Sequence, residues 1–482
     1  MKLFELLDRV EVLECTADPN MEITQIVCDS RKVTAGSLFV AVAGFAADGN
    51  RFIPMAMEKG AAVVVTAKKP EQDVPYVLVA SDRQALALIG TNYYGRPAES
   101  MTMIGVTGTN GKTSTTWLLK QVLEQVTGKK VGLVGTMANY IGQQELPTER
   151  TTPESIELQE LFAQMVQGGC SYAVMEVSSH ALVLDRVAGI TFDVAAFSNL
   201  TRDHLDFHNT MEEYCDAKAI LFGRCRKAVV NADDPWSQRM VQHCTAPVLT
   251  VSAAGEAGLQ AKNVQMHADR VCFDAVYGAE TARVEVPIPG NFTVYNALSV
   301  LGIALQLGIS LQDAVAALGK VQGVKGRVEV VPTAGKDYTI LIDYAHTPDG
   351  LENVLTSVRS FCKGRLIALF GCGGDRDRTK RPIMAGLGVK LADLTILTSD
   401  NPRTEEPGAI LRDMEAGVGD AKNYVVIENR VKAIHYAMDI AQKEDIIVLA
   451  GKGHETYQEI MGVKHHLDER EVVAAYLTET EK

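Results

Sequence analysis

The chain has 482 residues and a formal net charge of −13, with 46% apolar and 22% charged residues. This length predicts about three domains, and the composition is typical of a soluble globular protein. The negative charge argues against a nucleic-acid partner, whose phosphates would be repelled over most of the surface.

The N-terminal residues and the cysteines predict a cytoplasmic protein without a membrane partner. Residues 1–9 lack the long apolar core of a signal peptide, and no apolar run reaches the ~20 residues needed to span a bilayer. The nine cysteines are scattered, odd in number and without a C-x-x-C pair. That pattern predicts reduced core residues and argues against a disulfide or zinc framework.

Residues 1–98 alternate short apolar runs with turns, which predicts a small α/β domain. The predicted strands lie at 26–28, 38–42, 62–65 and 77–79, with a helical pattern at 52–59. Polar loops follow the first two strands, and loops at strand ends bind ligands in open α/β sheets. Ser30 and Arg31 in the first loop could hold a diphosphate, but a solvated turn is the simpler interpretation.

The stretch 103–116 carries the strongest functional signal. Residues 101–106 predict a buried strand, a glycine-rich turn follows, and an apolar-periodic segment from Thr113 predicts a helix. Backbone N–H groups and the helix dipole would then face an anion, Lys112 would reach terminal phosphates, and the Thr113 hydroxyl could ligate Mg²⁺. The match to the common phosphate-loop pattern is incomplete, because Val106 takes a glycine position. A glycine turn with an exposed lysine is the alternative, but the flanking strand and helix favour a nucleoside triphosphate site.

Two later segments offer groups for a metal ion. Glu176 ends a predicted strand, where its carboxylate can hold the Mg²⁺ of a nucleotide or, alternatively, cap a helix. Residues 203–208 carry four ionisable side chains soon after another predicted strand, 192–197. His204 lies in this stretch without an H-E-x-x-H arrangement, so a metal-linked phosphate site is favoured over a zinc protease.

Two positions have more than one interpretation on the residues alone. Lys218 precedes apolar residues, so a buried lysine open to covalent modification is possible, but an ordinary lysine that reaches solvent is the simpler interpretation. Asn296 falls on a predicted helix that begins near residue 290, where it could contact a nucleotide base or cap the helix.

Residues 329–482 restart an alternation of strands and helices, which predicts a third α/β domain. The predicted strands are 339–343, 365–370, 394–397 and 446–450, and a polar loop follows each. Because the carboxyl ends of parallel strands meet at one edge of a sheet, the arginines and carboxylates of these loops should share one rim. Such a mixture suits a zwitterionic substrate. The glycines at 371–374 lack the spacing of a dinucleotide-binding fingerprint.

Five motifs together resemble the Mur ligase family and span the predicted domains in the family's order. They lie at 107–113, 176–180, 199–208, 343–346 and 400–403. The resemblance implies an α/β protein with three domains. They are a small UDP-substrate-binding domain (1–98), a central phosphate-loop ATP-binding domain with a mainly parallel sheet (99–328), and a Rossmann-like domain for the acceptor amino acid (329–482).

The resemblance is greatest to those family members that join meso-2,6-diaminopimelate to UDP-N-acetylmuramoyl-L-alanyl-D-glutamate. It implies ATP and Mg²⁺ as cofactors, a substrate carboxylate that becomes an acyl phosphate, and an amine that displaces the phosphate. It further implies a cytoplasmic monomer in peptidoglycan precursor synthesis, with a role in cell wall biogenesis, cell shape, cell division and the cell cycle.

The resemblance also assigns roles to individual residues. Lys112, Glu176, His204 and Lys218 match catalytic positions, and metal-binding positions are Thr113, Glu176, His204 and Lys218, the last as a carbamate. The nucleotide-binding positions are Gly108, Thr109, Asn110, Gly111, Lys112, Thr113, Ser114, Asn296, Arg327, Asp343 and His346. The UDP-pocket positions are Cys28, Ser30, Phe45, Ala46 and Ala47, and the muramyl-dipeptide positions are Thr151, Thr152, Ser178 and Arg186.

The acceptor positions implied by the resemblance are Arg376, Asp400, Asn401, Pro402, Arg403, Gly451 and Glu455. Diaminopimelate differs from lysine by a carboxylate at its far end. Arg403 can take that carboxylate as a bidentate pair, whereas lysine leaves the guanidinium unmatched. Lysine-adding relatives lack this arginine, so the resemblance favours diaminopimelate.

Other interpretations give different expectations. The 400–403 motif and the UDP-type N-terminal domain argue against both a lysine-adding ligase and a folylpolyglutamate synthetase. A regulatory or motor protein driven by nucleoside triphosphates would turn over ATP without an amino acid, and we find no arginine-finger or switch pattern in its favour.

Overall fold

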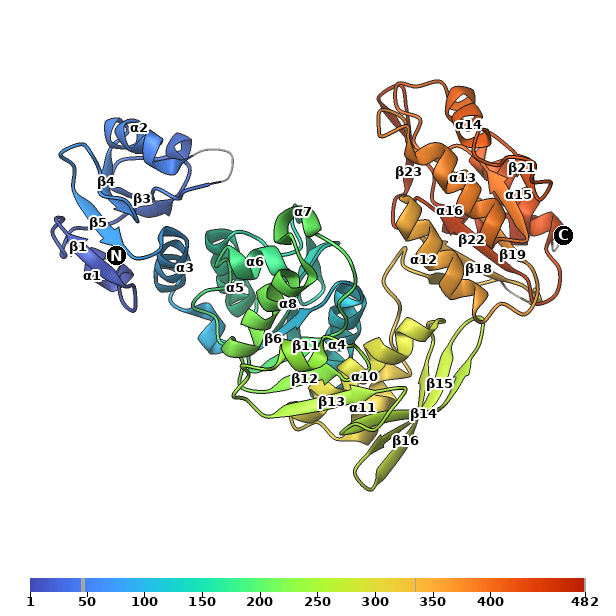
Figure 1. Cartoon of the computed structure of the whole chain (residues 1–482), viewed down its shortest axis with the longest axis horizontal. Coiled ribbons are helices and arrows are strands. Elements are labelled where there is room, and N and C mark those ends of the chain that lie inside the picture. The colour runs from blue at the N-terminus through green and yellow to red at the C-terminus, as the bar shows by residue number, and fades with distance from the viewer. Residues whose placement is uncertain (45–47, 334, 481–482) are drawn as a thin grey trace. The chain divides into compact units, whose positions relative to one another are not determined.

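The computed structural model describes residues 1–44, 48–333 and 335–480 (Figure 1). The backbone divides into two compact units. The first comprises Met1–Gln260 and Leu298–Ala314, and the second comprises Ala261–Ala297 and the chain from Val315 onward. Helices α10 (Asn291–Gln306) and α11 (Leu311–Leu318) each contain a unit boundary. Each unit contains a mainly parallel sheet with helices, as the alternating pattern predicts.

A five-stranded sheet begins the first unit, in the order β1-β5-β4-β3-β2, and only β1 runs antiparallel to its neighbour. Successive residues of a strand face opposite sides of a sheet. Leu38 and Val63 therefore pack with α1 and α3, while Phe39 and Val64 pack with α2. The elements are α1 (Leu3–Leu6), β1 (Val12–Cys15), β2 (Gln25–Val27), η1 (Ser30–Lys32), β3 (Ser37–Val40), η2 (Gly49–Phe52), α2 (Ile53–Glu58), β4 (Ala61–Thr66), β5 (Tyr76–Val79) and α3 (Asp82–Tyr93).

A second sheet of the first unit has the order β13-β12-β11-β6-β10-β7-β8-β9 within that unit. Strands β13 to β7 are parallel, and β8 is antiparallel to both neighbours. The strands are β6 (Thr102–Thr107), β7 (Lys130–Val134), β8 (Asn139–Ile141), β9 (Gln144–Leu146), β10 (Cys170–Glu176), β11 (Val194–Phe197), β12 (Ala228–Asn231) and β13 (Val248–Ser252). Strands β11 and β12 are buried along their whole length, as expected for a parallel sheet covered on both faces.

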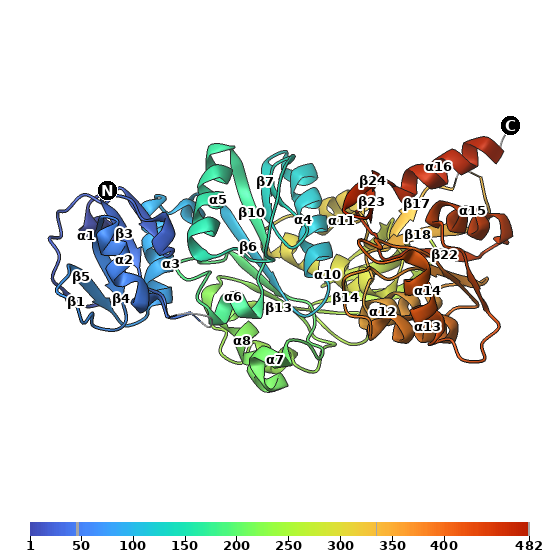
Figure 2. The same cartoon turned by 90° about the horizontal axis from the view of Figure 1, so that it is seen from above.

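Helices connect these strands and carry the loops at their carboxyl ends. They are η3 (Pro97–Ser100), α4 (Lys112–Thr127), α5 (Ser155–Gln167), α6 (Ser179–Val183), α7 (Leu205–His208), α8 (Met211–Ala219), η4 (Ile220–Arg224) and α9 (Ser237–Met240). Figure 2 shows α4 beside β7. Helix α4 begins directly after the glycine-rich turn, as predicted, and α5 begins at Ser155 with Glu154 as its N-terminal cap.

The second unit contains a six-stranded sheet in the order β17-β18-β22-β19-β20-β21, in which only β17 is antiparallel. Its strands are β17 (Glu329–Val331), β18 (Thr339–Asp343), β19 (Leu366–Phe370), β20 (Leu394–Leu397), β21 (Tyr424–Val426) and β22 (Ile446–Ala450). One face packs against α12 (Pro348–Arg359), α13 (Lys380–Leu391) and α14 (Pro407–Glu415). The other face packs against α15 (Arg430–Ile440) and α16 (Glu469–Thr480). The four strands predicted from the sequence are β18, β19, β20 and β22, within one residue of their expected bounds.

The second unit also contains two antiparallel hairpins. One is formed by β15 (Val271–Tyr277) and β16 (Glu280–Val286), beside β14 (Leu259–Met266). The other, formed by β23 (Tyr457–Ile460) and β24 (Val463–His466), follows the loop after β22. Among the described residues, no helix combines the length and apolar composition needed to cross a membrane.

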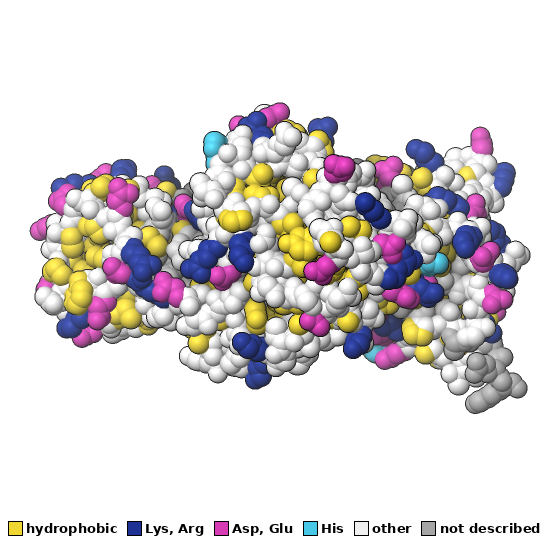
Figure 3. Space-filling view, turned by 90° about the horizontal axis from the view of Figure 1, so that it is seen from below, with side chains coloured by type: hydrophobic (Ala, Val, Ile, Leu, Met, Phe, Trp, Pro, Cys, Tyr) yellow, Lys and Arg dark blue, Asp and Glu magenta, His cyan; other side chains and the backbone are white. Residues whose placement is uncertain are grey.

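The surface and the cysteines fit an ordinary α/β protein. Acidic and basic side chains lie among one another on the face drawn in Figure 3. All nine cysteines are free thiols, but Cys15 and Cys28 are exposed, so the prediction that the cysteines are core residues is wrong for these two.

Candidate active site

The loop between β6 and α4 is folded for close approach of an anion. Gly108 and Gly111 have φ values of 145° and 84°, which favour glycine. A Cβ atom on Gly108 would lie 2.0 Å from Oγ of Ser198, so a side chain is excluded there. Lys112 begins α4, and its Nζ donates to the carbonyl oxygens of Gly108 and Thr109 over 2.9 Å each. Burial lowers the pKa of Lys112, and the charges of Glu176 and Asp203 act in the opposite direction.

The segment after β11 holds this loop in place. The N–H groups of Thr109 and Asn110 donate to the backbone oxygen and to Oδ1 of Asn199, over 2.8 and 3.0 Å. The Ser198 hydroxyl donates to the oxygen of Asn110 over 2.6 Å. Sequence reasoning missed Ser198 and Asn199, although the position of their motif after a neighbouring strand pointed to this edge.

Glu176 lies at the carboxyl end of β10 and faces the first turn of α4. Its Oε2 accepts hydrogen bonds from the hydroxyls of Thr113 and Thr136, both over 3.0 Å, and its Oε1 accepts from Thr136 N over 2.8 Å. Ser178, not Glu176, caps the following helix, so the helix-cap alternative for Glu176 is wrong. A carboxylate and a hydroxyl beside a phosphate loop are the oxygen donors that Mg²⁺ prefers.

Lys218 on α8 is buried beneath the same loop, with 1% of its surface exposed. Its Nζ donates to Gly108 O over 2.9 Å and lies 4.6 Å from the ring centroid of Tyr214. Burial, with the nearby charge of Lys112, holds the pKa of Lys218 well below its ordinary value of 10.5. The simpler interpretation from the sequence, a lysine that reaches solvent, is therefore wrong.

Three histidines gather next to this lysine. His204 is exposed, in a left-handed conformation with φ of 52°, and its ring centroid lies 5.0 Å from that of His180. His208 is buried, and its Nε2 lies 2.8 Å from the Ser179 hydroxyl. Burial, followed by nearby positive groups, lowers the pKa of His208 to about 4. No set of three or more His, Cys, Asp or Glu side chains in the described part of the chain is arranged to hold a metal ion.

The structure brings the predicted dipeptide-binding residues together beside Glu176. The Thr152 hydroxyl donates to the backbone oxygen of Glu176 over 2.8 Å, and it accepts from Ser178 N over 3.2 Å. The Thr151 hydroxyl lies 3.0 Å from the hydroxyl oxygen of Thr136. Arg186 donates to Thr152 O over 3.1 Å and pairs with Glu154 over 2.6 Å. Burial lowers the pKa of Arg186, while Glu154 acts against this shift.

Two of the predicted UDP-pocket residues, Cys28 and Ser30, lie just after strand β2 of the N-terminal sheet. Cys28 follows β2 and is exposed, while Ser30 is buried at the start of η1 with its hydroxyl 3.5 Å from Met55 Sδ. Arg31 pairs with Asp29 over 2.8 Å, which supports the solvated-turn interpretation for this arginine. Phe45, Ala46 and Ala47 lie outside the described residues.

Three of the remaining predicted nucleotide contacts, Arg327, Asp343 and His346, lie next to or within the first two strands of the six-stranded sheet, β17 and β18. Asp343 ends β18 and accepts hydrogen bonds from Val328 N and Ala345 N over 2.9 and 2.8 Å. Burial raises the pKa of this carboxyl above its ordinary value of 3.8. Arg327 lies 5.6 Å from the ring centroid of Tyr344, and the backbone oxygen of Tyr344 lies 2.8 Å from Nδ1 of His346. Asn296 lies on α10, as predicted.

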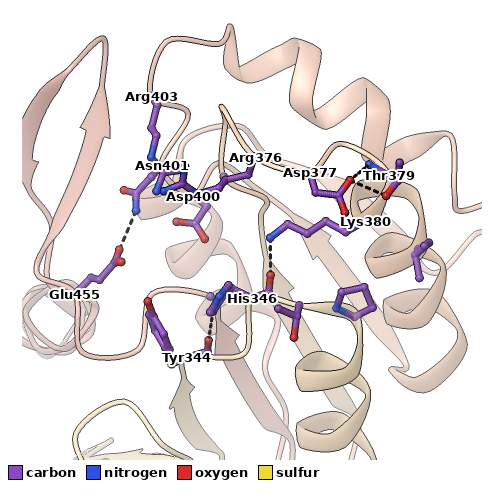
Figure 4. Close-up of a pocket in the computed structure, with 15 residues that line it drawn as sticks. Tyr344, His346, Arg376, Asp377, Thr379, Lys380, Asp400, Asn401, Arg403 and Glu455 are labelled. Atoms are coloured by element: carbon purple, nitrogen blue, oxygen red, sulfur yellow. Dashed lines mark hydrogen bonds between the residues drawn. The ribbon is translucent and has the colours of Figure 1, made fainter. Parts of the chain in front are cut away.

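The loops after β18, β19, β20 and β22 meet around one cavity of about 580 Å³ (Figure 4). The predicted single rim is therefore confirmed. Six of the seven predicted acceptor residues line the cavity: Arg376, Asp400, Asn401, Arg403, Gly451 and Glu455. Pro402, the seventh, lies between Asn401 and Arg403, and its backbone oxygen would lie 1.9 Å from a Cβ atom on Gly374.

Arg403 is held in place from two sides. Its backbone has a left-handed φ of 49°, and its N and O atoms bond to Glu459 O and Met461 N of the β23–β24 hairpin. Its Nη1 donates to Gly374 O over 2.8 Å, and its Nε lies 3.5 Å from Oε2 of Glu459. The remaining N–H donors of the guanidinium can take a carboxylate.

Two wholly buried cations, which sequence reasoning missed, support this cavity. Arg381 on α13 pairs with Glu405 over 2.7 Å and with Asp413 over 2.8 Å. Lys452 follows Gly451 and donates to Asn401 and Glu455 over 3.1 Å each. The basic residue within 451–455 was visible in the sequence, but its burial was not.

A glycine-rich loop beside a carboxylate suits a nucleoside triphosphate with Mg²⁺, and a polar cavity of arginines and carboxylates suits a zwitterionic acceptor. Both features together fit the class of ATP-dependent ligases. Models of three family segments match the chain: "Mur ligase family, catalytic domain" at 22–94, "Mur ligase middle domain" at 106–304 and "Mur ligase, glutamate ligase domain" at 326–453. The chain belongs to the Mur ligase family.

Individual relatives agree over the full length. The chain is 47% identical to UDP-N-acetylmuramoyl-L-alanyl-D-glutamate–2,6-diaminopimelate ligase 1 of Clostridium acetobutylicum, over 99% of this chain and 100% of that protein. It is 43% identical to the Bacillus licheniformis ligase of the same name without the numeral, with the same coverage.

Solved structures give the same result. A structure of a UDP-N-acetylmuramoyl-L-alanyl-D-glutamate–2,6-diaminopimelate ligase matches with a TM-score of 0.79 and 32% identity, over 100% of this chain and 99% of that chain. A MurF ligase from Thermotoga maritima in complex with ADP matches with a TM-score of 0.57 and 19% identity, over 95% of this chain and 98% of that chain, and supports the fold alone.

Proposed function

We propose that this chain is the ATP-dependent ligase that joins meso-2,6-diaminopimelate to UDP-N-acetylmuramoyl-L-alanyl-D-glutamate in peptidoglycan precursor synthesis. The observation that carries this proposal is the cavity that combines Arg376 and Arg403 with Asp400 and Glu455. Two guanidinium groups and two carboxylates suit an acceptor with both charges at both ends. The full-length similarity to ligases named for this reaction supports it.

In the proposed reaction, the dipeptide's γ-carboxylate attacks the γ-phosphate of ATP and forms an acyl phosphate with release of ADP. The acceptor amine then attacks the acyl carbon, and inorganic phosphate leaves as the amide forms. The loop of Gly108–Ser114 would hold the phosphates, and Lys112 would turn from its backbone partners toward them. Asn296, Arg327, Asp343 and His346 would contact the nucleotide.

Thr113 and Glu176 would hold Mg²⁺, which neutralises developing phosphate charge. His204 and a carbamate on Lys218 would bind a second Mg²⁺ ion. The burial of Lys218 and its lowered pKa support this modification, since an uncharged amine is the form that reacts with carbon dioxide. The cluster of Thr151, Thr152, Ser178 and Arg186 beside Glu176 would hold the dipeptide. Cys28, Ser30 and residues 45–47 would contact the UDP group.

The remaining parts of the proposal concern the whole protein. Three domains, 1–98, 99–328 and 329–482, would bind the UDP-linked substrate, ATP and the acceptor amino acid, respectively. The three matched family segments support this division of the chain. We place the enzyme in the cytoplasm as a monomer without nucleic-acid or membrane partners. Its product would feed cell wall biogenesis and thereby cell shape, division and the cell cycle.

The test is ATP-dependent phosphate release with UDP-N-acetylmuramoyl-dipeptide, comparing diaminopimelate with lysine as acceptor. Phosphate release that requires the dipeptide and diaminopimelate together, with little release for lysine, is the expected result. Equal use of lysine would favour the lysine-adding alternative. Steady ATP hydrolysis without either substrate would favour a regulatory nucleotide-binding protein.

A further inference from the structure

A buried lysine, Lys452, lies next to the acceptor cavity and is not among the residues proposed to bind the acceptor. Lys452 stands at the carboxyl end of β22, directly after Gly451, and its side chain is wholly buried. Gly451 has φ of 112°, and a Cβ atom there would lie 2.7 Å from Oδ2 of Asp400. The loop backbone therefore passes directly against Asp400, which places the lysine behind the cavity wall.

The ammonium of Lys452 has partners from both loops that it joins. Its Nζ donates to Oδ1 of Asn401 and to Oε2 of Glu455, both over 3.1 Å. It lies 3.7 Å from Oδ1 of Asp400 and 5.6 Å from the ring centroid of Tyr457. The ammonium therefore donates hydrogen bonds to Asn401 and Glu455, and Asp400 is close enough for an ion pair.

Lys452 also fixes the orientation of Asn401. The Asn401 oxygen accepts from Lys452 and, over 2.9 Å, from Glu459 N, so the amide nitrogen is turned toward Glu455, to which it donates over 2.8 Å. A closed triangle of Lys452, Asn401 and Glu455 results. Because each member has two partners, the Glu455 carboxylate is held in one position toward the cavity.

The charges around the cavity depend on this lysine. Asp400 and Glu455 bring two negative charges to one side, and Lys452 cancels one of them from behind. The net charge presented by this group is that of a single carboxylate, which matches the single ammonium left on an acceptor whose other amino group is the nucleophile. Without Lys452, the two carboxylates of Asp400 and Glu455 would favour acceptors that carry additional positive charge.

We propose that Lys452 is a positioning residue that sets the acceptor specificity of this cavity through charge, without contacting the acceptor. This inference rests on the proposed function. Diaminopimelate has two carboxylates and two amino groups, whereas lysine has one carboxylate and two amino groups. Removal of the Lys452 charge therefore weakens the binding of diaminopimelate, the zwitterionic diacid, and strengthens the relative binding of lysine, which is more cationic.

The experiment compares Lys452→Met, Lys452→Gln and Lys452→Arg in the full-length enzyme by phosphate release with each acceptor. For the Met and Gln variants we expect the KM for diaminopimelate to rise about tenfold or more, the KM for ATP to stay unchanged, and the preference for diaminopimelate over lysine to narrow about tenfold. Lys452→Arg keeps the charge and should recover most of that preference. Lys422→Met, at an exposed position before β21, is the matched control and should behave as wild type.

Gln keeps a hydrogen-bond donor, so the Gln variant carries the test if Lys452→Met fails to fold. If the Met and Gln variants prefer diaminopimelate over lysine as strongly as the wild type does, the inference is overturned. This holds whether the variants keep their activity or lose it through a lower kcat alone. Failure of the wild-type enzyme to couple diaminopimelate would instead overturn the proposed function, so the two failures are distinguishable.

Discussion

Lys112 and Lys218 donate hydrogen bonds to the same acceptor, the carbonyl oxygen of Gly108, over 2.9 Å in each case. One lysine begins α4 and the other is buried on α8, so two lysine side chains from separate helices converge beneath the phosphate loop. The convergence requires Gly108, whose backbone conformation and close contact with Ser198 exclude a side chain. The loop, its lysine and the proposed modification site are thus a single packed arrangement.

The first prediction concerns Lys218. We expect Lys218→Ala to lower activity about 100-fold, because a metal-binding carbamate would be lost, and we expect added small carboxylates such as acetate or propionate to restore part of it. Phosphate release with both substrates, with and without the added acid, measures this. The control is Lys262→Ala, at an exposed position on β14, which should keep wild-type activity with and without the added carboxylate. Full activity of untreated Lys218→Ala would contradict the carbamate role.

The second prediction concerns Glu176, whose carboxylate meets the hydroxyls of Thr113 and Thr136. Glu176→Gln keeps the shape but removes the charge, so the Mg²⁺ concentration for half-maximal activity should rise about 10- to 100-fold. A magnesium titration of phosphate release is the measurement. Glu145→Gln, on the exposed β9, is the control. A normal magnesium requirement in Glu176→Gln would remove Glu176 from the metal site.

The strands and loops that carry the site could be predicted from sequence because their signals are local. Apolar runs ending in polar loops located β6, β18, β19, β20 and β22 within one residue, and parallel pairing then required the loops to share an edge. The cavity after the last four strands confirms that inference. The family resemblance, not the local pattern, supplied the individual roles.

What could not be predicted depends on burial by distant segments. The local sequence favoured an exposed Lys218, and only the packing of α8 beneath residue 108 determines the opposite. Arg381 and Lys452 are polar residues whose burial is stabilised by partners in other loops, Glu405 for one and Asn401 for the other. The hydrophobic periodicity of the sequence carries no information about such pairs between distant loops.

A third prediction concerns Arg403. Arg403→Lys retains a positive charge but loses the fork that can pair with a distal carboxylate, and charged hydrogen bonds contribute about 1.5–3 kcal/mol. The KM for diaminopimelate should therefore rise about 10- to 100-fold, while the weak use of lysine stays unchanged. Arg412→Lys, whose side chain is exposed and pairs with Glu406, is the control. Equal losses for both acceptors in Arg403→Lys would exclude recognition of the distal carboxylate.

A fourth prediction concerns pH and His208. Its pKa is about 4 in the folded protein, below the ordinary 6.5, so the unfolded chain binds more protons between these values. The stability contributed by neutral His208 is therefore complete above about pH 6.5 and is lost as the pH falls toward 4, with an upper limit of about 3 kcal/mol. The groups that act on it are His180, Lys218, His204 and Glu213.

The measurement is the melting temperature of wild type and His208→Asn between pH 7.5 and 4.5. We expect the wild type to lose more stability than the variant on acidification, and His243→Gln, at an exposed histidine, to follow the wild type. Parallel curves for wild type and His208→Asn would show that protonation of another group governs the acid sensitivity.

The last prediction uses two arginines that share one partner. Arg381 is wholly buried and pairs with Glu405 and Asp413, whereas Arg378 is exposed and pairs with Asp413. Glu405 also accepts from Asp375 N over 2.7 Å, and Asp375 accepts from the Thr404 hydroxyl over 2.7 Å. The guanidinium of Arg381 therefore ties the loop of Arg376 to the loop of Arg403.

Removing one member of a buried ion pair costs about 3–5 kcal/mol, and an exposed pair contributes at most about 1 kcal/mol. We expect Arg381→Met to lose stability near the lower end of the first range, since its acidic partners are partly exposed, and to raise the KM for diaminopimelate. Arg378→Met should change neither quantity appreciably. Chemical unfolding and phosphate release measure the two effects. If Arg381→Met is destabilised but keeps its KM, the pair stabilises the second unit without positioning the acceptor loops.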